Sequence, residues 1–84
     1  MSDEDVAALR QLVEFLARGV VDRPEQVSVT GTVDAGAALL RIQVAAEDVG
    51  KVIGRQGRVI HAIRTVARAA AVRRGQRVTV EVLD

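Results

Sequence analysis

The stretch VIGRQGRVI, residues 52–60, holds two glycines three residues apart, Gly54 and Gly57. Because glycine has no Cβ, the backbone between them can turn sharply and approach a ligand closely. A helix is predicted to begin after Gly57, and the free N–H groups at a helix N-terminus attract phosphate. This spacing therefore predicts non-covalent binding of a phosphate group.

Charged and polar side chains surround these glycines. Arg55 and Gln56 lie between them, Arg58 follows the second, and Lys51 comes three residues before the first. Such a loop can hold a phosphodiester backbone by charge and by backbone donors without demanding a particular base. The alternative is a tight turn between two helices that binds nothing, and the cation Arg55 in the middle of the turn argues against it.

No other residues suggest a reaction. The chain has no Cys, which excludes a disulfide scaffold, a thiolate zinc site and a cysteine nucleophile. His61, the only histidine, is predicted on the polar face of a helix with no second metal ligand near it in sequence. Ser2 and Ser28, the only serines, are predicted as a helix cap and on the outer face of a strand. We therefore expect no catalytic residue, no metal site and no cofactor.

The formal net charge of +1 conceals an uneven distribution. Residues 1–50 hold four Arg against nine Asp and Glu, a net charge of −5. Residues 51–84 hold eight Lys and Arg against two acids, a net charge of +6, and the 27 residues from Lys51 to Arg77 contain no acid. The second part of the chain therefore suits a polyanionic partner.

The length of 84 residues fits one small domain, and we expect residues 1–84 to form it. No apolar run approaches the roughly 20 residues needed to span a bilayer. The first five residues, MSDED, are acidic where a signal peptide would be basic. The cytoplasm is therefore the expected compartment, with no membrane span.

Periodic apolar residues predict six elements in the order α-β-β-α-α-β. Ser2 and Asp5 have the spacing of a helix N-cap, Gly19 ends that helix, and Pro24 breaks the connection that follows. Gly75 has the place of a helix C-cap. The predicted elements are a helix from Ser2 to Gly19, strands over 27–33 and 39–44, helices over 45–53 and 58–74, and a strand over 78–82.

The connections determine how the strands pair. The short turn over 34–37 predicts an antiparallel hairpin between the first two strands. The two consecutive helices form a crossover between the second and third strands, and right-handed crossovers favour a parallel pair. The expected fold is α+β, with a three-stranded mixed sheet and three helices on one face.

The segment Gly54-Arg55-Gln56-Gly57, between two helices inside a β-α-α-β unit, resembles the GxxG signature of the KH domain. The helix and strand that come before this unit resemble the type II, prokaryotic arrangement, and the resemblance covers the whole chain. The length of the chain and the connector over 21–25 are similar to those of the small bacterial single-KH RNA-binding proteins of the KhpA type.

The resemblance implies a groove for about four single-stranded nucleotides. Its walls are the GxxG loop with the helix after it, and the second strand, with Leu40, Ile42 and Val44, beside the turn over 34–38. Some of these three side chains are expected to be core, with only their edges touching bases. Because the chain has no Trp or Tyr and its one Phe is distant, stacking is missing and binding should be weak and salt-sensitive. The RNA-binding residues that the resemblance implies are Lys51, Ile53, Gly54, Arg55, Gln56, Gly57 and Arg58.

The basic residues further along the chain have a second interpretation. Arg64 and Arg68 fit a solvated helix face as well as they fit contact with nucleic acid. Arg73 and Arg74 complement the dipole at a helix C-terminus, and Arg77 lies in the following turn. These last three are therefore left out of the predicted site.

The sequence and the resemblance together predict a non-catalytic protein that grips short single-stranded RNA, with single-stranded DNA as the alternative ligand. The resemblance implies an RNA chaperone or post-transcriptional regulator that acts as a homodimer or with a larger KH protein of the Jag type. Two joined grooves raise avidity without new contacts. The alternative function is a protein–protein module for dimerisation or docking, in which RNA binding is secondary.

Overall fold

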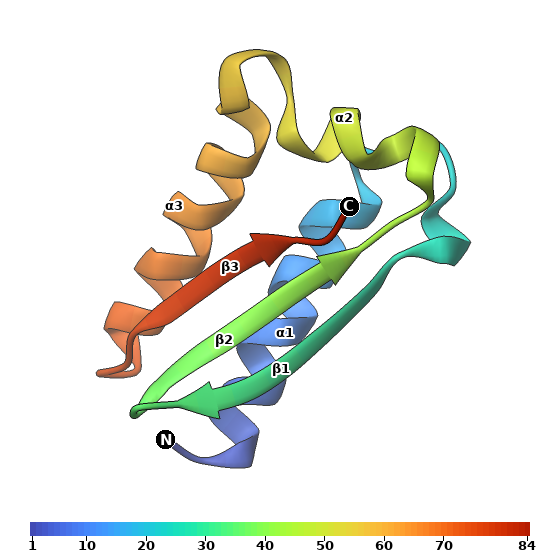
Figure 1. The fold of residues 1–84 in the computed structure, drawn as a ribbon. Coiled ribbons are helices and arrows are strands. Elements are labelled where there is room, and N and C mark those ends of the chain that lie inside the picture. The colour runs from blue at the N-terminus through green and yellow to red at the C-terminus, as the bar shows by residue number, and fades with distance from the viewer.

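The computed structural model describes residues 1–84, and its main elements follow the predicted order. Figure 1 shows the three strands side by side, with the two long helices α1 and α3 packed along one face and α2 at the end of that layer. No helix is both long and apolar enough to cross a membrane. The bounds are α1 Asp3–Arg18, β1 Ser28–Asp34, β2 Ala37–Gln43, α2 Val49–Ile53, α3 Arg58–Arg73 and β3 Val78–Val82.

β2 is the central strand of a mixed sheet. It pairs antiparallel with β1, with Asp34 opposite Ala37 at the turn, and parallel with β3. Ala35 and Gly36 form the turn with φ of 52° and 79°, the type I′ pattern that matches the twist of a hairpin. The hairpin and the parallel crossover confirm the predicted α+β topology.

One apolar core lies between the sheet and the helices. Leu9, Val13 and Ala17 face it from α1 at intervals of four residues, as expected for an amphipathic helix. Val33, which pairs with Ala38 one position before the end of the hairpin ladder, is half exposed. The other core residues are Val27, Val29, Ala38, Leu40, Ile42, Val52, Ile60, Ile63, Ala67, Ala71, Val78 and Val80.

The ends of the long helices follow the local sequence. The Ser2 hydroxyl accepts a hydrogen bond from the Asp5 N–H at 3.1 Å, and the Asp5 carboxylate accepts one from the Ser2 N–H at 3.4 Å. This capping box confirms the predicted start of α1. At the end of α3, Gly75 has φ of 69°, and the N–H of Gln76 donates to the Ala71 carbonyl at 2.8 Å. Both helices therefore have defined ends.

The segment 45–53, predicted as one helix, is divided. A 3₁₀ turn over Ala46–Asp48 leads into α2, which has five residues. Asp48 ends the 3₁₀ turn, and its side chain is fully buried. Its carboxylate accepts hydrogen bonds from the N–H groups of Asp22 and Arg23 at 3.3 and 3.0 Å. Asp48 therefore fastens the connector after α1 to the start of α2.

Candidate nucleic-acid interface

Gly54 ends α2 in a conformation that glycine alone adopts readily, with φ of 79° and ψ of 169°. A Cβ at this position would lie 2.5 Å from Cγ2 of Val59 and 2.8 Å from its backbone nitrogen. The position therefore requires glycine twice over, for its backbone angles and for the close approach of the loop to α3.

The turn after Gly54 is left-handed at two consecutive residues. Gln56 has φ of 58° and Gly57 has φ of 74°, and the Gly57 N–H donates to the Gly54 carbonyl at 3.1 Å. Gly57 is the N-cap residue of α3, and no side chain caps the helix there. The positive end of the α3 dipole is therefore open to an anion.

Long polar side chains stand around this open helix end. Arg55, Gln56 and Arg58 are exposed, and their only side-chain hydrogen bond is from Arg58 Nη2 to Gln56 Oε1 at 3.2 Å. Both guanidinium groups therefore keep donors for a ligand. Ile53 beside them is 39% exposed, which leaves an apolar surface next to the cations. The structure thus brings six of the seven predicted residues, 53–58, to one tip of the molecule.

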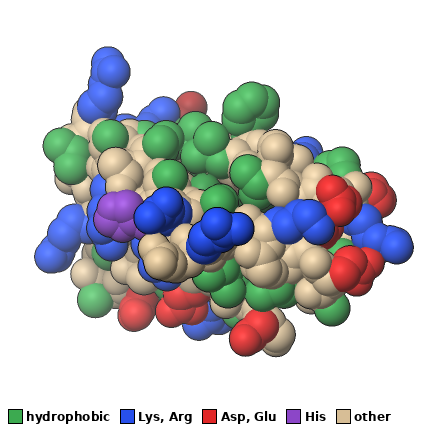
Figure 2. Space-filling model, turned by 90° about the horizontal axis from the view of Figure 1, so that it is seen from above, with side chains coloured by type: hydrophobic (Ala, Val, Ile, Leu, Met, Phe, Trp, Pro, Cys, Tyr) green, Lys and Arg blue, Asp and Glu red, His purple; other side chains and the backbone are tan.

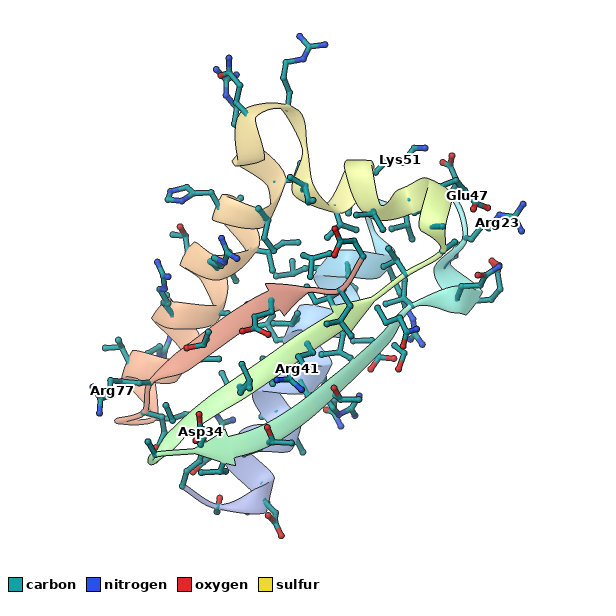
Figure 3. The ribbon with its side chains drawn as sticks, viewed as in Figure 1. Arg23, Asp34, Arg41, Glu47, Lys51 and Arg77 are labelled. Atoms are coloured by element: carbon teal, nitrogen blue, oxygen red, sulfur yellow. The ribbon has the colours of Figure 1, made fainter.

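Lys51, the seventh predicted residue, is held by acids on the outer side of α2. Its Nζ lies 2.9 Å from Oδ2 of Asp22 and 3.7 Å from Oδ1 of Asp48. The hydrogen bond to Asp22 raises the pKa of Lys51 above its ordinary value of 10.5. Figure 3 shows Lys51 at the same end of the molecule as Arg23 and Glu47, which form an ion pair of 2.7 Å. Lys51 is therefore charged but already partnered.

The second strand contributes mainly to the core, as expected of some of its residues, and its place in the groove wall stays a prediction. Leu40 and Ile42 are fully buried, and Val44 is partly buried against the core. Both fully buried side chains belong to the core between the sheet and the helices. Arg64 of α3 donates from Nε to the Val80 carbonyl of β3 at 3.1 Å. The free edge of β3 therefore lies beside α3.

The basic residues divide evenly into those with and those without a carboxylate partner. Arg10, Arg18, Arg23, Arg41, Lys51 and Arg74 are in ion pairs. The unpaired ones all follow Gly54. Figure 2, which looks onto the end of the molecule with the glycine loop, shows basic side chains across the middle of that end. Those unpaired residues are Arg55, Arg58, Arg64, Arg68, Arg73 and Arg77.

A hollow of about 510 Å³ lies at the far end of α3 from the glycine loop. The hairpin turn, the last turns of α3 and the start of β3 form its walls, with Arg68 and Arg77 as its cations and Val72 as an exposed apolar residue. Figure 3 shows Asp34 and Arg77 together at this end. The predicted site does not include Arg77, which the pairing of β2 with β3 brings beside the hairpin turn.

The element order and the GxxG loop between α2 and α3 define a KH domain of the type II arrangement. The chain belongs to the KhpA/KhpB KH-domain family, whose model matches residues 10–82. The RNA-binding protein KhpA of Clostridium acetobutylicum is 47% identical over 75 residues, which cover 89% of this chain and 100% of that protein. The KhpA of Treponema pallidum is 43% identical over 74 residues, 88% of this chain and 92% of that protein. These relatives are named for RNA binding rather than for a reaction, as expected for a non-catalytic protein.

Solved structures show the same fold within a larger protein. Era in complex with MgGDPNP and nucleotides 1506–1542 of 16S ribosomal RNA matches with a TM-score of 0.66 and 17% identity, over 93% of this chain and 31% of that one. Era of Aquifex aeolicus bound to GDP and aluminium fluoride matches with a TM-score of 0.63 and 18% identity. The chain thus spans about a third of these proteins, and the likeness supports the fold.

Proposed function

We propose that this chain is a non-catalytic protein that grips short single-stranded RNA through the Gly54–Gly57 loop and the adjoining face of α3. The observation that carries the proposal is the segregation of charge, because every cation without a carboxylate partner lies between Arg55 and Arg77. A phosphodiester backbone supplies the anions that this surface lacks. The name of the KhpA relatives, RNA-binding protein, supports RNA as the polyanion.

The residues of the loop have separable roles. Gly54 and Gly57 let the backbone approach a phosphate at the open end of α3. Arg55, Gln56 and Arg58 contact phosphate or sugar, and their exposed donors and acceptor support this assignment. Ile53 offers an apolar surface to a base. These contacts carry little base preference, so specificity is low.

The bound strand runs from the loop along α3 toward the hollow at the hairpin turn. His61, Arg64 and Arg68 recur at helical spacing on the side of α3 that faces β3. From Arg58 to Val72 the helix rises by about 21 Å, which suits the roughly four nucleotides that a KH domain holds. No aromatic residue stacks on the bases, so one domain binds weakly and with strong salt dependence.

Arg68→Ala tests this path. We expect the affinity for a fluorescein-labelled RNA octamer to fall roughly three- to tenfold, and the salt slope of log K to shrink by about 0.7, because one phosphate contact is lost. The matched control is Arg41→Ala, which removes an equal charge that already pairs with Glu81 at 3.3 Å and should change neither quantity. Fluorescence anisotropy over a salt series measures both. Equal losses of RNA affinity in the two variants would contradict a path of the RNA along α3.

Asp22→Asn is expected to tighten RNA binding roughly two- to threefold, because it frees Lys51 for phosphate and removes a nearby negative charge. Glu25→Gln is the matched control, since it removes an equal charge from the same connector without breaking an ion pair. Adding Lys51→Ala to Asp22→Asn should cancel the gain. Anisotropy titrations of the four proteins check this, and weaker binding by Asp22→Asn would show that the ion pair positions Lys51 for RNA instead.

We further propose that the chain works in the cytoplasm as one domain over residues 1–84, as an RNA chaperone or post-transcriptional regulator. Because one domain binds RNA weakly, a homodimer or a pair with a larger KH protein of the Jag type would raise the overall affinity through avidity. Crosslinking in cells would identify the bound transcripts. A single-stranded DNA octamer that competes as well as RNA of the same sequence would remove the preference for RNA.

A docking module is the second candidate function, and one observation favours it. An apolar hollow of about 360 Å³ lies between α1 and α3, on the other side of α3 from Arg64 and Arg68. A protein partner suits this surface better than a polyanion does. Variants of the glycine loop that no longer bind RNA separate the two functions, because a docking module would keep its activity in them.

A further inference from the structure

Unpaired polar groups surround the hollow of about 510 Å³ at the end of α3 that lies away from the glycine loop. Asp34 is the one acid among its lining residues, and Arg68 and Arg77 are its cations. None of the three forms an ion pair within the chain. Hollows of this size take small organic groups, and the few polar side chains around such a hollow fix the orientation of the ligand.

The register of the sheet places Asp34 and Arg77 on either side of Ala37. Asp34 pairs with Ala37 across the hairpin. On the other side of β2, the Ala38 N–H donates to the Arg77 carbonyl at 2.9 Å, which sets Arg77 beside Ala37. β1 and β3 lie about 10 Å apart, which is two strand spacings, and only the small Ala37 side chain stands between them at this end. A carboxylate and a guanidinium group can therefore reach one flat ligand from two sides.

The surface between these charged groups is apolar. Ala71 and Val78 are buried beneath it, and Val72 at its rim is 72% exposed. Apolar side chains of this kind pack against the flat face of a nucleobase. A phosphate fits less well, because the Asp34 carboxylate would repel it. The hollow therefore has the chemistry of a base-binding site.

We propose that this hollow selects a guanine base at one position of the bound RNA, with Asp34 on its Watson–Crick edge and Arg77 on its Hoogsteen edge. A carboxylate only accepts hydrogen bonds, and guanine offers it two adjacent donors, N1–H and the N2 amino group. Adenine and cytosine place an acceptor beside their amino group, and uracil places a carbonyl on each side of its N–H. The O6 and N7 atoms of guanine accept two hydrogen bonds from one guanidinium group. Guanine is therefore the base that satisfies both side chains.

The place of the hollow on the RNA path fits this role. The inference rests on the proposed function, since the strand that leaves the glycine loop along α3 brings the base to the hollow. Arg68, one of the cations of the hollow, contacts the phosphate of the guanine nucleotide. The contacts at the loop carry little base preference, so the preference arises at the far end of the path. It concerns one of about four nucleotides and leaves the overall specificity low.

Two RNA octamers of uridine test the preference, one with a guanosine and one with an adenosine in the fifth position. The purine has at least three neighbours on each side, so it can reach the hollow whichever way the strand runs. We expect the parent to bind the guanosine octamer about five- to twentyfold more tightly, because two base edges are read by charged groups. Fluorescence anisotropy measures both affinities. Equal affinities would overturn the inference.

Asp34→Asn tests the carboxylate. The preference for guanosine should fall below about threefold, since the amide keeps one acceptor oxygen but turns a donor toward the N–H groups of the base. Glu25→Gln is the matched control, because it removes an equal charge from an exposed side chain outside the hollow, and it should keep the full preference. Circular dichroism checks that both variants are folded. A preference that survives Asp34→Asn would overturn the assignment of Asp34 to the Watson–Crick edge.

Arg77→Lys tests the guanidinium group. Lysine keeps the positive charge but lacks the two parallel donors of arginine. We therefore expect the preference for guanosine to fall about two- to fivefold while the salt slope of log K stays that of the parent. An unchanged preference would overturn the assignment of Arg77 to the Hoogsteen edge.

Guanosine monophosphate keeps this inference apart from the proposed function. In NMR titrations it should shift the amide signals of residues 34–37 and 76–79 at lower concentration than adenosine monophosphate does, and Asp34→Asn should remove that difference. A parent that binds the two octamers equally well would overturn the guanine site and leave RNA binding intact. A parent that binds neither octamer but still distinguishes the two monophosphates would overturn the RNA-binding proposal and support the site.

Discussion

Replacing Arg55 and Gln56 together by Asp is expected to abolish RNA binding and to leave the chain folded. The change removes a guanidinium group and aims two carboxylates at the phosphate position beside the open end of α3. A hydrogen bond to a charged group contributes about 1.5–3 kcal/mol, and the two anions add repulsion. We therefore expect the affinity for an RNA octamer to fall roughly 100-fold or more. Fluorescence anisotropy measures the loss.

The fold should survive this change, because the Arg55 side chain has no partner in the chain and Gln56 contacts only Arg58. Asp also accepts the left-handed conformation that position 56 requires. The matched control combines Arg55→Gln with Gln56→Asn, which removes one charge and adds none, and it should lose only about three- to tenfold. Unchanged circular dichroism would verify folding. An Asp variant that bound RNA as tightly as the parent would rule out the loop-based mechanism.

The parts of the site that the sequence predicts well are those that short stretches of chain determine. Gly54 and Gly57 stand three residues apart because the turn needs positive φ at both, and that requirement is visible in the sequence itself. The Ser2–Asp5 capping box and the Gly75 end of α3 are local in the same sense. Together these signals place the loop and its helix correctly before any tertiary contact is known.

The electrostatics of the site depend on contacts that no local pattern reveals. Asp48 receives backbone hydrogen bonds from residues 25 and 26 positions earlier, so its burial cannot be inferred from its place at a helix start. Lys51 and Arg55 are both cations near the glycine loop, but Lys51 is paired with Asp22, which lies far away in the sequence. Charge counting alone treats both cations as free. Only the folded chain separates the partnered cation from the unpartnered one.

Whether the side chains of the second strand are exposed depends on the helices that cover the sheet. Leu40 and Ile42 alternate with Arg41 and Gln43, which indicates a strand with one apolar face but not how closely that face is covered. The parallel pairing of β3 places β2 at the centre of the sheet, where both side chains are enclosed. The edge beside α3 then belongs to β3, and Arg77 at its start joins the hollow. The strand pairing was predicted, whereas the packing of the helices over these two side chains is a property of the whole chain.

Gly54→Ala is expected to destabilise the chain by about 3 kcal/mol, the sum of an unfavourable backbone conformation and overpacking. The new Cβ would lie 2.8 Å from the backbone nitrogen of Val59, which cannot move without shifting α3. For a domain of this size such a loss lowers the melting temperature by roughly 12–24 °C. Thermal and urea unfolding followed by circular dichroism measure both quantities.

Gly57→Ala separates the cost of the backbone conformation from the cost of overpacking. Gly57 also has a positive φ, of 74°, but a Cβ there would meet nothing within 4 Å. We expect it to cost only about 1 kcal/mol, the backbone term alone. Adding Val59→Ala to Gly54→Ala should recover part of the loss, since it removes the Cγ2 contact at 2.5 Å but keeps the contact with the backbone nitrogen. Equal costs at positions 54 and 57 would contradict a role for close packing. The first glycine would then serve the turn alone, and the distance between the loop and α3 would have to be set by the helices themselves.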